Sequence, residues 1–175
     1  MYYCDVDTGK VQWPAPGLNI DSVYGFSKAY GDTFHHGVDI NSTGTKYDTC
    51  AGMDAVAACN GTAYFNLKGE SSAYGNHVWI SSSDCPGMYI WYEHLDDLNG
   101  HADNSSARVT RGEIIGHIDT TGNSTGPHLH FEIRIKDNTY GPSDGPGSSV
   151  DPELYLDTST KNVTLSKKSS STGTT

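Results

Sequence analysis

The chain has 175 residues, which is enough for one domain with a hydrophobic core and too few for two domains of ordinary size. Hydrophobic residues make up 35% of it while Gly, Ser, Thr and Tyr are abundant, and this composition favours short strands and many turns over long helices. The formal net charge of −10 argues against a nucleic-acid partner, because such binding depends on Lys and Arg neutralising phosphates, and no apolar run is long enough to span a membrane.

The first predicted elements are extended. Residues 1–17 contain Trp13-Pro14-Ala15-Pro16-Gly17, whose prolines exclude a helix, and we expect an N-terminal arm here. Residues 18–25 alternate in character and end at a glycine, which predicts a short strand. The N-terminal residues do not resemble a signal-peptide core, so we interpret the chain as a processed secreted protein or an excised domain.

A candidate pair of metal ligands follows in residues 34–40. His35 and Asp39 lie four residues apart, a spacing that puts both side chains on the same side of an extended segment. Gly37 between them allows another backbone segment to approach closely. An imidazole and a carboxylate on one side of a packed edge are two candidate ligands.

The middle of the chain predicts short strands separated by turns. The predicted strands are residues 54–58, 62–65, 76–81 and 88–95. His94 lies at the end of the last of them, where functional sites are commonly built, although a lone histidine in that position is more often structural. We expect residues 96–107 to form a polar loop and residues 109–118 to form a turn followed by a strand.

Four cysteines, Cys4, Cys50, Cys59 and Cys85, include no C-x-x-C pair, which argues against a zinc knuckle. An even number of widely spaced cysteines suits an oxidising compartment and two disulfides. Of the three possible pairings we favour Cys50–Cys59, closing a short loop, together with Cys4–Cys85. The alternative is a set of buried free thiols.

The strongest pattern occupies residues 126–135. Read with the two-residue period of a strand, the segment puts polar residues on one face and apolar residues on the other, namely His128, His130, Glu132 and Arg134 against Leu129, Phe131, Ile133 and Ile135. The apolar face belongs in a core, and the two imidazoles opposite suit either a structural role or a metal or catalytic site. Residues 137–149 then form a turn-rich insertion, and residues 158–175 a flexible Ser/Thr/Lys-rich tail.

Three of these candidates form a plausible ligand set. His35, Asp39 and His130 supply two imidazoles and one carboxylate, the number of protein ligands that a catalytic zinc site uses while keeping a fourth position for water. His94 and His128 remain as candidates beside it. The sequence contains neither a His-Glu-x-x-His motif nor a Gly-x-Ser-x-Gly elbow, which argues against the common helical zinc proteases and against a serine hydrolase.

The motifs, taken in order, resemble those of the lysostaphin-type (LytM-like) zinc metalloendopeptidases, which are peptidoglycan hydrolases. Residues 35–39 match the His-x-Gly-x-Asp motif of that family, residues 92–95 its Tyr-x-His-Leu context, and residues 126–132 its closing Gly-Pro-His-Leu-His-Phe-Glu motif. The resemblance covers about residues 18–156. It implies a mainly β fold, in which an antiparallel sheet of short strands with long loops and little helix carries a substrate groove.

The resemblance also implies the domain limits and the walls of the groove. We expect a zinc metallopeptidase domain over residues 18–157, between the arm of residues 1–17 and the tail of residues 158–175. The expected walls are the loops 27–34, 66–75, 96–107 and 120–127.

Each site residue acquires a role from the same resemblance. His35, Asp39 and His130 would bind one Zn²⁺ ion, with His35 selected over His36. His94 and His128 would be the catalytic histidines. Some relatives also carry a tyrosine that stabilises the oxyanion; Tyr30 is the candidate here and Tyr24 a substitute, and a core or rim position is the alternative for both.

The implied function is a zinc-dependent endopeptidase that uses metal-activated water and two histidines to hydrolyse peptidoglycan, in either the stem peptide or the cross-bridge. The alternative is a catalytically silent module of the same fold that binds the wall or activates another hydrolase. We expect an extracellular or wall-associated protein, bacterial or phage-borne, that acts as a monomer on peptidoglycan peptides. The motifs do not choose the bond that is cut.

Overall fold

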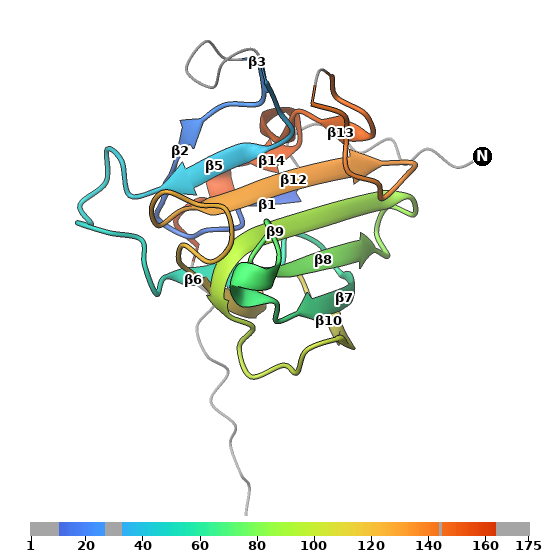
Figure 1. The fold of residues 1–175 in the computed structure, drawn as a ribbon, viewed down its shortest axis with the longest axis horizontal. Coiled ribbons are helices and arrows are strands. Elements are labelled where there is room, and N and C mark those ends of the chain that lie inside the picture. The colour runs from blue at the N-terminus through green and yellow to red at the C-terminus, as the bar shows by residue number, and fades with distance from the viewer. Residues whose placement is uncertain (1–10, 27–32, 144, 164–175) are drawn as a thin grey trace, which may run out of the picture.

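The computed structural model describes residues 11–26, 33–143 and 145–163. This part of the chain is mainly antiparallel β-structure, with one ten-stranded sheet, two two-stranded sheets and short 3₁₀ turns (Figure 1). The strands are β1 Val11–Gln12, β2 Asn19–Ser22, β3 Gly25–Phe26, β4 Phe34–His35, β5 Val38–Asn41, β6 Asp54–Val56, β7 Gly61–Asn66, β8 Asn76–Ser82, β9 Met88–Asp97, β10 Ser105–Val109, β11 Ile114–Ile118, β12 Leu129–Ile135, β13 Ser149–Val150 and β14 Leu156–Asp157. The 3₁₀ turns are η2 Gly69–Ser71, η3 Pro152–Leu154 and η4 Thr158–Thr160. The expected fold class is confirmed, and among these residues no helix is long and apolar enough to cross a membrane.

The ten-stranded sheet is organised around its central strands. Its main path runs in the order β10-β7-β8-β9-β12-β5-β2, and β11, β6 and β13 pair beside that path. β9 and β12 are antiparallel, in a register that runs from His130 opposite Glu93 to Ile135 opposite Met88. On its other edge β12 pairs with β5, where His130 lies directly opposite Asp39. The centre of the sheet therefore brings together residues that are about ninety positions apart in the sequence.

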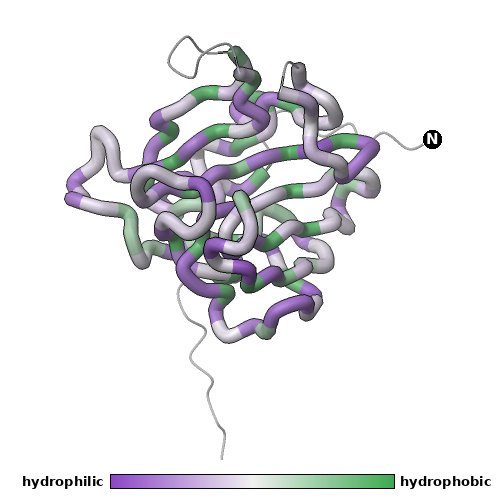
Figure 2. Tube along the Cα trace, in the orientation of Figure 1, coloured by the Kyte–Doolittle hydropathy of each residue, from purple (hydrophilic) through white to green (hydrophobic). Residues whose placement is uncertain are grey.

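The predicted alternation of the closing motif is present on β12. Leu129, Phe131 and Ile133 are fully buried in the hydrophobic core, and burying a side chain of this size stabilises the fold by about 1.5–3 kcal/mol. Figure 2 shows the same alternation of hydrophobic and hydrophilic positions along the strands of the sheet. The polar face of β12 is not open to solvent, however, because Glu132 and Arg134 each keep only 1% of their surface exposed.

Residues 11–18 pack onto the body of the molecule. β1 pairs in parallel with β14, which brings the two ends of the described chain together. Trp13, Ala15 and Leu18 belong to the hydrophobic core. The backbone N–H of Trp13 also donates to the hydroxyl of Thr160, at 2.9 Å. The proline-punctuated segment is not helical, as predicted, but it is not extended either: it bends after Trp13 into a turn in which the N–H of Leu18 donates to the carbonyl of Ala15. It fills part of the core.

The predicted loop 96–107 is shorter than expected. β9 continues to Asp97, and β10 begins at Ser105 and pairs with β7 along its whole length. The turn between them contains Asn99 and Gly100, both with positive φ, a conformation that these two residue types tolerate best. β10 was missed because its Ser-Ser-Ala-Arg-Val sequence has almost no apolar alternation, and cross-strand pairing forms the strand instead.

The predicted disulfide Cys50–Cys59 is wrong, because both residues are buried free thiols. The Cys50 thiol donates to the carbonyl of Pro127 at 3.1 Å, beneath the closing motif. Cys59 lies elsewhere in the core beside Ser82, and burial raises the pKa of its thiol to about 11 despite a hydrogen bond with that serine. Each thiol thus behaves as a small core side chain. Cys4 lies outside the described residues, so the pairing Cys4–Cys85 stays a prediction.

Candidate metal centre and groove

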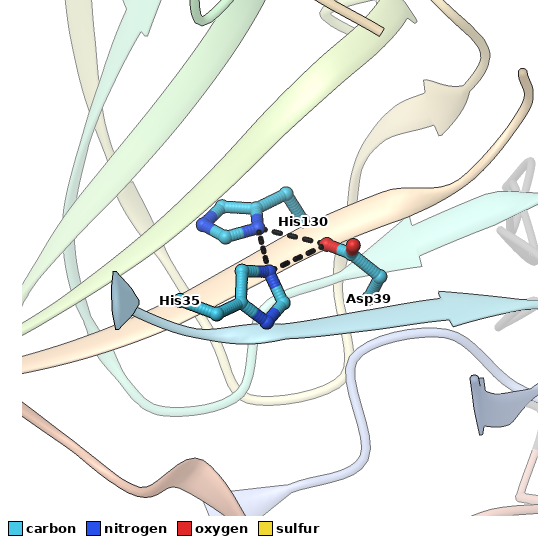
Figure 3. A group of neighbouring side chains, drawn as sticks. All are labelled: His35, Asp39 and His130. Atoms are coloured by element: carbon cyan, nitrogen blue, oxygen red, sulfur yellow. Dashed lines mark hydrogen bonds and ion pairs between the residues drawn. The ribbon is translucent and has the colours of Figure 1, made fainter. Parts of the chain in front are cut away.

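Three predicted ligands converge on one point at the centre of the sheet. His35 lies at the end of β4, Asp39 on β5 and His130 on β12, and Figure 3 shows their side chains pointing toward one another. The Nδ1 atom of His130 is 2.8 Å from Oδ1 of Asp39 and 3.2 Å from Nε2 of His35. Nε2 of His35 is 3.3 Å from the same Asp39 oxygen.

A break between β4 and β5 makes this convergence possible. The break contains Gly37, where an added Cβ atom would lie only 2.3 Å from the carbonyl oxygen of Phe131 on β12. A glycine therefore lets β5 approach β12 closely enough to face His130. The predicted close approach at Gly37 is confirmed.

Hydrogen bonds on the side away from the ligand cluster fix the orientation of the His35 and His130 imidazoles. Nδ1 of His35 donates to the backbone carbonyl of Val23 at 2.8 Å, which directs Nε2 toward Asp39. Nε2 of His130 donates to Oε1 of Glu132 at 2.9 Å, which leaves Nδ1 directed at the same point. A carboxylate or carbonyl behind a metal-binding histidine is the usual way to fix its tautomer.

The donor set fits a small cation. Tetrahedral zinc with bonds of about 2.0–2.1 Å separates its ligand atoms by roughly 3.3 Å. Two of the three separations among His35, Asp39 and His130 are close to this, at 3.2 and 3.3 Å, and the third is shorter, at 2.8 Å. Burial alone would raise the pKa of Asp39, yet its hydrogen bonds with His130 and His35 hold that pKa far below its usual range. Burial would lower the pKa of His130, but Glu93, Asp39 and Glu132 raise it well above its ordinary value. Positive charge is therefore favoured at this point.

Two further histidines stand beside the ligand set, as predicted. His94 lies on β9 with a φ of 65°, and its Nδ1 donates to the carbonyl of Thr121 at 2.8 Å. Nδ1 of His128 donates to the carbonyl of Gly126 at 2.8 Å, and its Nε2 lies 3.6 Å from Oδ1 of Asp39. The two imidazole rings are 4.9 Å apart. In both residues the outer nitrogen, Nε2, is the atom left to act as an acceptor.

The neutral form of His94 is strongly favoured. Burial, with a smaller contribution from the neighbouring His128 and His130 rings, lowers its pKa to about 4, although its hydrogen bond to the carbonyl of Thr121 acts in the opposite direction. At neutral pH the His94 imidazole is therefore uncharged and able to accept a proton.

These side chains line a groove of about 590 Å³. Its lining comes from the ligand strands, Phe34 included, and from loop residues Thr33, Ala73, Tyr74 and 123–127. Residues 27–32 of the predicted wall 27–34 lie outside the described residues, so that part of the wall stays a prediction. Tyr140 of the 137–149 insertion also lines it, whereas no residue of the predicted wall 96–107 does. That segment instead leads to β10, at the end of the sheet path away from β5. The prediction of this wall is wrong, and the insertion supplies a wall in its place.

Sequence reasoning missed the buried charges next to His130. Oε2 of Glu132 accepts from Nε of Arg134 at 2.9 Å, and the guanidinium of Arg134 lies 4.0 Å above the ring of Trp91. Both Arg134 and Trp91 are tied to Asn138, through its backbone and side-chain oxygens respectively. The sequence predicted only that Glu132 and Arg134 share one face of a strand with His128 and His130, and not that the two charged side chains are buried. Glu93, on β9 opposite His130, was not singled out at all.

The structure describes only one of the two tyrosine candidates for stabilising the oxyanion. Tyr30 lies outside the described residues, so its role stays a prediction. The hydroxyl of Tyr24 donates to the carbonyl of Ser149 at 3.0 Å, and its ring packs edge-on against Phe34. These contacts give Tyr24 a packing role at the rim.

The remaining histidines hold other parts of the structure. The buried His36 ring lies 2.9 Å from the carbonyl of Pro142 through Nε2, which fastens the 137–149 insertion. His77 and His101 stack on Trp91 and Phe65 respectively. His117 lies between Asp97 and Asp54. None of these four contributes a ligand atom to the cluster of His35, Asp39 and His130.

An antiparallel sheet that carries two imidazoles and a carboxylate in an open groove, with two more histidines alongside, has the arrangement of a metal-dependent hydrolase. The sequence model of Peptidase family M23 matches residues 33–142. The DD-carboxypeptidase/endopeptidase Mpg of Neisseria meningitidis serogroup B is 35% identical over 141 residues, which cover 78% of this chain and 31% of that protein. This chain therefore belongs to peptidase family M23.

A further relative agrees with this assignment, and solved structures share the fold. The peptidoglycan DD-endopeptidase ShyC of Vibrio cholerae is 35% identical over 97 residues, 53% of this chain and 20% of that protein. The structure of lysostaphin from Staphylococcus simulans aligns with a TM-score of 0.63 at 23% identity, over 96% of this chain and 59% of that chain. The catalytic domain of EnpA from Enterococcus faecalis aligns with a TM-score of 0.60 at 24% identity, over 83% and 97%. At these identities the structures support the fold alone, and the chain spans about a third or less of the two curated relatives described here.

Proposed function

We propose that this chain is a zinc-dependent endopeptidase that hydrolyses peptide bonds in bacterial peptidoglycan. The observation that carries the proposal is the convergence of three ligand atoms, from His35, Asp39 and His130, at separations of 2.8–3.3 Å. Membership of peptidase family M23 and the names of the relatives supply the reaction class and the substrate class.

His35, Asp39 and His130 are the residues that would hold the ion. Zn²⁺ bound there supplies Lewis-acid chemistry, lowering the pKa of a bound water toward about 7 and polarising a peptide carbonyl. With one carboxylate and two neutral imidazoles the ligand set carries a single negative charge, so the ion keeps most of its positive charge.

His94 and His128 are the residues that we assign to proton transfer. Each keeps its Nδ1 hydrogen on a backbone carbonyl and therefore presents Nε2 as an acceptor. A positioned imidazole of this kind takes the proton of the attacking water and returns it to the leaving amine, which contributes typically about 10²–10⁴-fold in rate. Once protonated, the same imidazoles stabilise the oxyanion that develops on the carbonyl.

The proposed setting follows from the substrate. Peptidoglycan lies outside the cytoplasmic membrane, so we propose an extracellular or wall-associated protein, and we propose that it acts as a monomer. All three ligand positions and both histidines are filled, which argues against the alternative of a silent wall-binding module.

The proposal is tested by metal content and activity together. The purified chain should contain about one equivalent of zinc and release soluble peptides from isolated walls, and a chelator should stop the release until zinc is added back. Mass spectrometry of fragments from walls with glycine cross-bridges and from walls with direct D-alanyl cross-links identifies the bond. A metal-free protein that binds walls and releases nothing would instead favour the silent module.

A further inference from the structure

The insertion of residues 137–149 forms a wall of the groove through Tyr140. None of its described residues supplies a ligand atom to the metal centre. Tyr140 keeps 57% of its surface exposed, so its ring is not a core side chain. A large exposed aromatic residue on the wall of a groove is a candidate contact for a ligand, provided that the backbone carrying it is held in place.

On one side of Tyr140 the insertion is fastened by His36, which follows β4. The His36 ring is buried, and its Nε2 donates to the carbonyls of Pro142 at 2.9 Å and Gly145 at 3.0 Å. Because a carbonyl oxygen only accepts, Nε2 is the nitrogen that carries the hydrogen. The loop also lies close against the ring, since a Cβ atom added at Gly141 would be 2.5 Å from Nε2. His36 therefore holds the backbone directly after Tyr140.

On the other side of Tyr140 the insertion is fastened to the sheet by Asn138. The side-chain Oδ1 of Asn138 accepts from the indole N–H of Trp91 on β9 at 2.6 Å, and its backbone carbonyl accepts from Arg134 on β12 at 3.0 Å. Both donors are buried, which shields these bonds from water. The chain is thus held two residues before Tyr140 as well as directly after it.

The ring of Tyr140 also has neighbours that restrict it. Its centroid is 4.8 Å from that of His36 and 6.0 Å from that of Tyr74, and both of these rings line the same groove. The guanidinium carbon of Arg134 lies 5.8 Å from the centre of the ring. A ring that is held in this way, with more than half of its surface open, can contact a ligand at little further cost in conformational entropy.

We propose that Tyr140 is a substrate-contacting residue of the groove, and that His36 and Asn138 are positioning residues that hold it. The proposal rests on the proposed peptidase function, because Tyr140 lines the same groove as the metal centre. The open ring surface is apolar and fits an aliphatic side chain of the peptide, whose burial against the ring strengthens binding. Tyr140 is not a ligand, so the contact acts on KM and leaves kcat nearly unchanged.

The test measures zinc content, kcat and KM of the zinc-loaded full chain on soluble cross-linked wall peptides. Tyr140→Ala should keep its zinc, raise KM by about 5- to 20-fold and change kcat by less than about twofold. Tyr140→Phe should behave like the wild type, because it keeps the ring. Tyr47→Ala truncates an exposed tyrosine that does not line the groove, and this matched control should change neither constant. An unchanged KM in Tyr140→Ala overturns the proposal and leaves the peptidase function standing.

A double-mutant cycle tests the positioning role. His36→Ala should raise KM by a similar factor, and adding Tyr140→Ala to it should raise KM no further, because both changes remove the same contact. His101→Ala removes a histidine that stacks on Phe65 away from the groove lining, and it should leave KM unchanged. If His36→Ala loses zinc or does not fold, Asn138→Ala takes its place in the cycle. Two effects that multiply in the double variant overturn the positioning role.

If the wild-type chain hydrolyses none of these peptides, the proposed function fails, and binding still tests the contact. Binding of the same peptides is then followed by tryptophan fluorescence. Weaker binding by Tyr140→Ala than by Tyr47→Ala supports the contact at Tyr140. Equal binding by the two variants, or no binding by the wild type, overturns it.

Discussion

At the scale of single residues, Glu132 links the candidate metal centre to the rest of the sheet. It accepts from Nε2 of His130 with one oxygen and from Arg134 with the other. Burial alone would raise the pKa of Glu132, but His130 and Arg134 lower it, so the carboxylate is charged where it meets the imidazole. A charged partner behind the ring increases the basicity of Nδ1, the atom that points at Asp39.

Glu132→Gln should therefore weaken zinc binding by about 10- to 100-fold, because the amide carries no charge to polarise His130. It should also destabilise the fold by about 3–5 kcal/mol, because the buried Arg134 loses its counter-ion. Competition with a chromogenic chelator measures the first effect and urea unfolding the second. Glu153→Gln serves as the exposed control, and equal zinc affinity in the two variants would contradict the role given to Glu132.

At the scale of elements, the centre depends on how closely β5 approaches β12. The approach is set at Gly37, whose Cα lies against the backbone of Phe131. A side chain here would push the β4–β5 segment away from β12 and separate Asp39 from His130, which now face each other across the strand pair.

Gly37→Ala should lower stability by about 1–3 kcal/mol and weaken zinc binding, because the new methyl group would meet a carbonyl oxygen at 2.3 Å. Thermal unfolding with and without zinc measures both effects. Gly145→Ala is the matched control, since an added Cβ there meets nothing within 4 Å. If both substitutions behave alike, the close approach of the strands does not control the metal centre.

Some strands could be predicted from the sequence and others could not. The alternation of residues 126–135 and the spacing of His35 and Asp39 are local patterns, and they were sufficient to predict extended segments where β4, β5 and β12 lie, although not the break between β4 and β5. β10 has no such pattern and is defined by its pairing with β7. The buried Glu93 could not be predicted either, because its burial depends on residues from separate segments that meet only in the fold.

At the scale of the whole molecule, the first described strand helps to close the structure. β1 pairs with β14, and Trp13 between β1 and β2 is buried in the core with 4% of its surface exposed. Residues 11–18 thus contribute to the stability of the body, although residues 11–17 were predicted from the sequence to belong to an N-terminal arm.

Trp13→Ala should destabilise the protein by about 3–5 kcal/mol through the cavity that it leaves, and it should leave zinc stoichiometry unchanged because Trp13 is not among the residues that line the groove. Denaturant unfolding and metal analysis check the two parts. Leu67→Ala, which truncates an exposed side chain, should cost less than about 0.5 kcal/mol. A Trp13→Ala protein as stable as the Leu67→Ala protein would mean that residues 11–18 add little to the fold.

The two histidines of the closing motif, His128 and His130, are assigned different functions, proton transfer and metal binding. The most direct measurement determines zinc content and turnover on cross-linked wall peptides for His130→Ala and His128→Ala in parallel. His130→Ala should lose the metal, because it removes one of three converging ligands, whereas His128→Ala should keep the metal and lose about 10²–10⁴-fold in turnover. Near-normal turnover in His128→Ala, or full zinc occupancy in His130→Ala, would contradict the assignment.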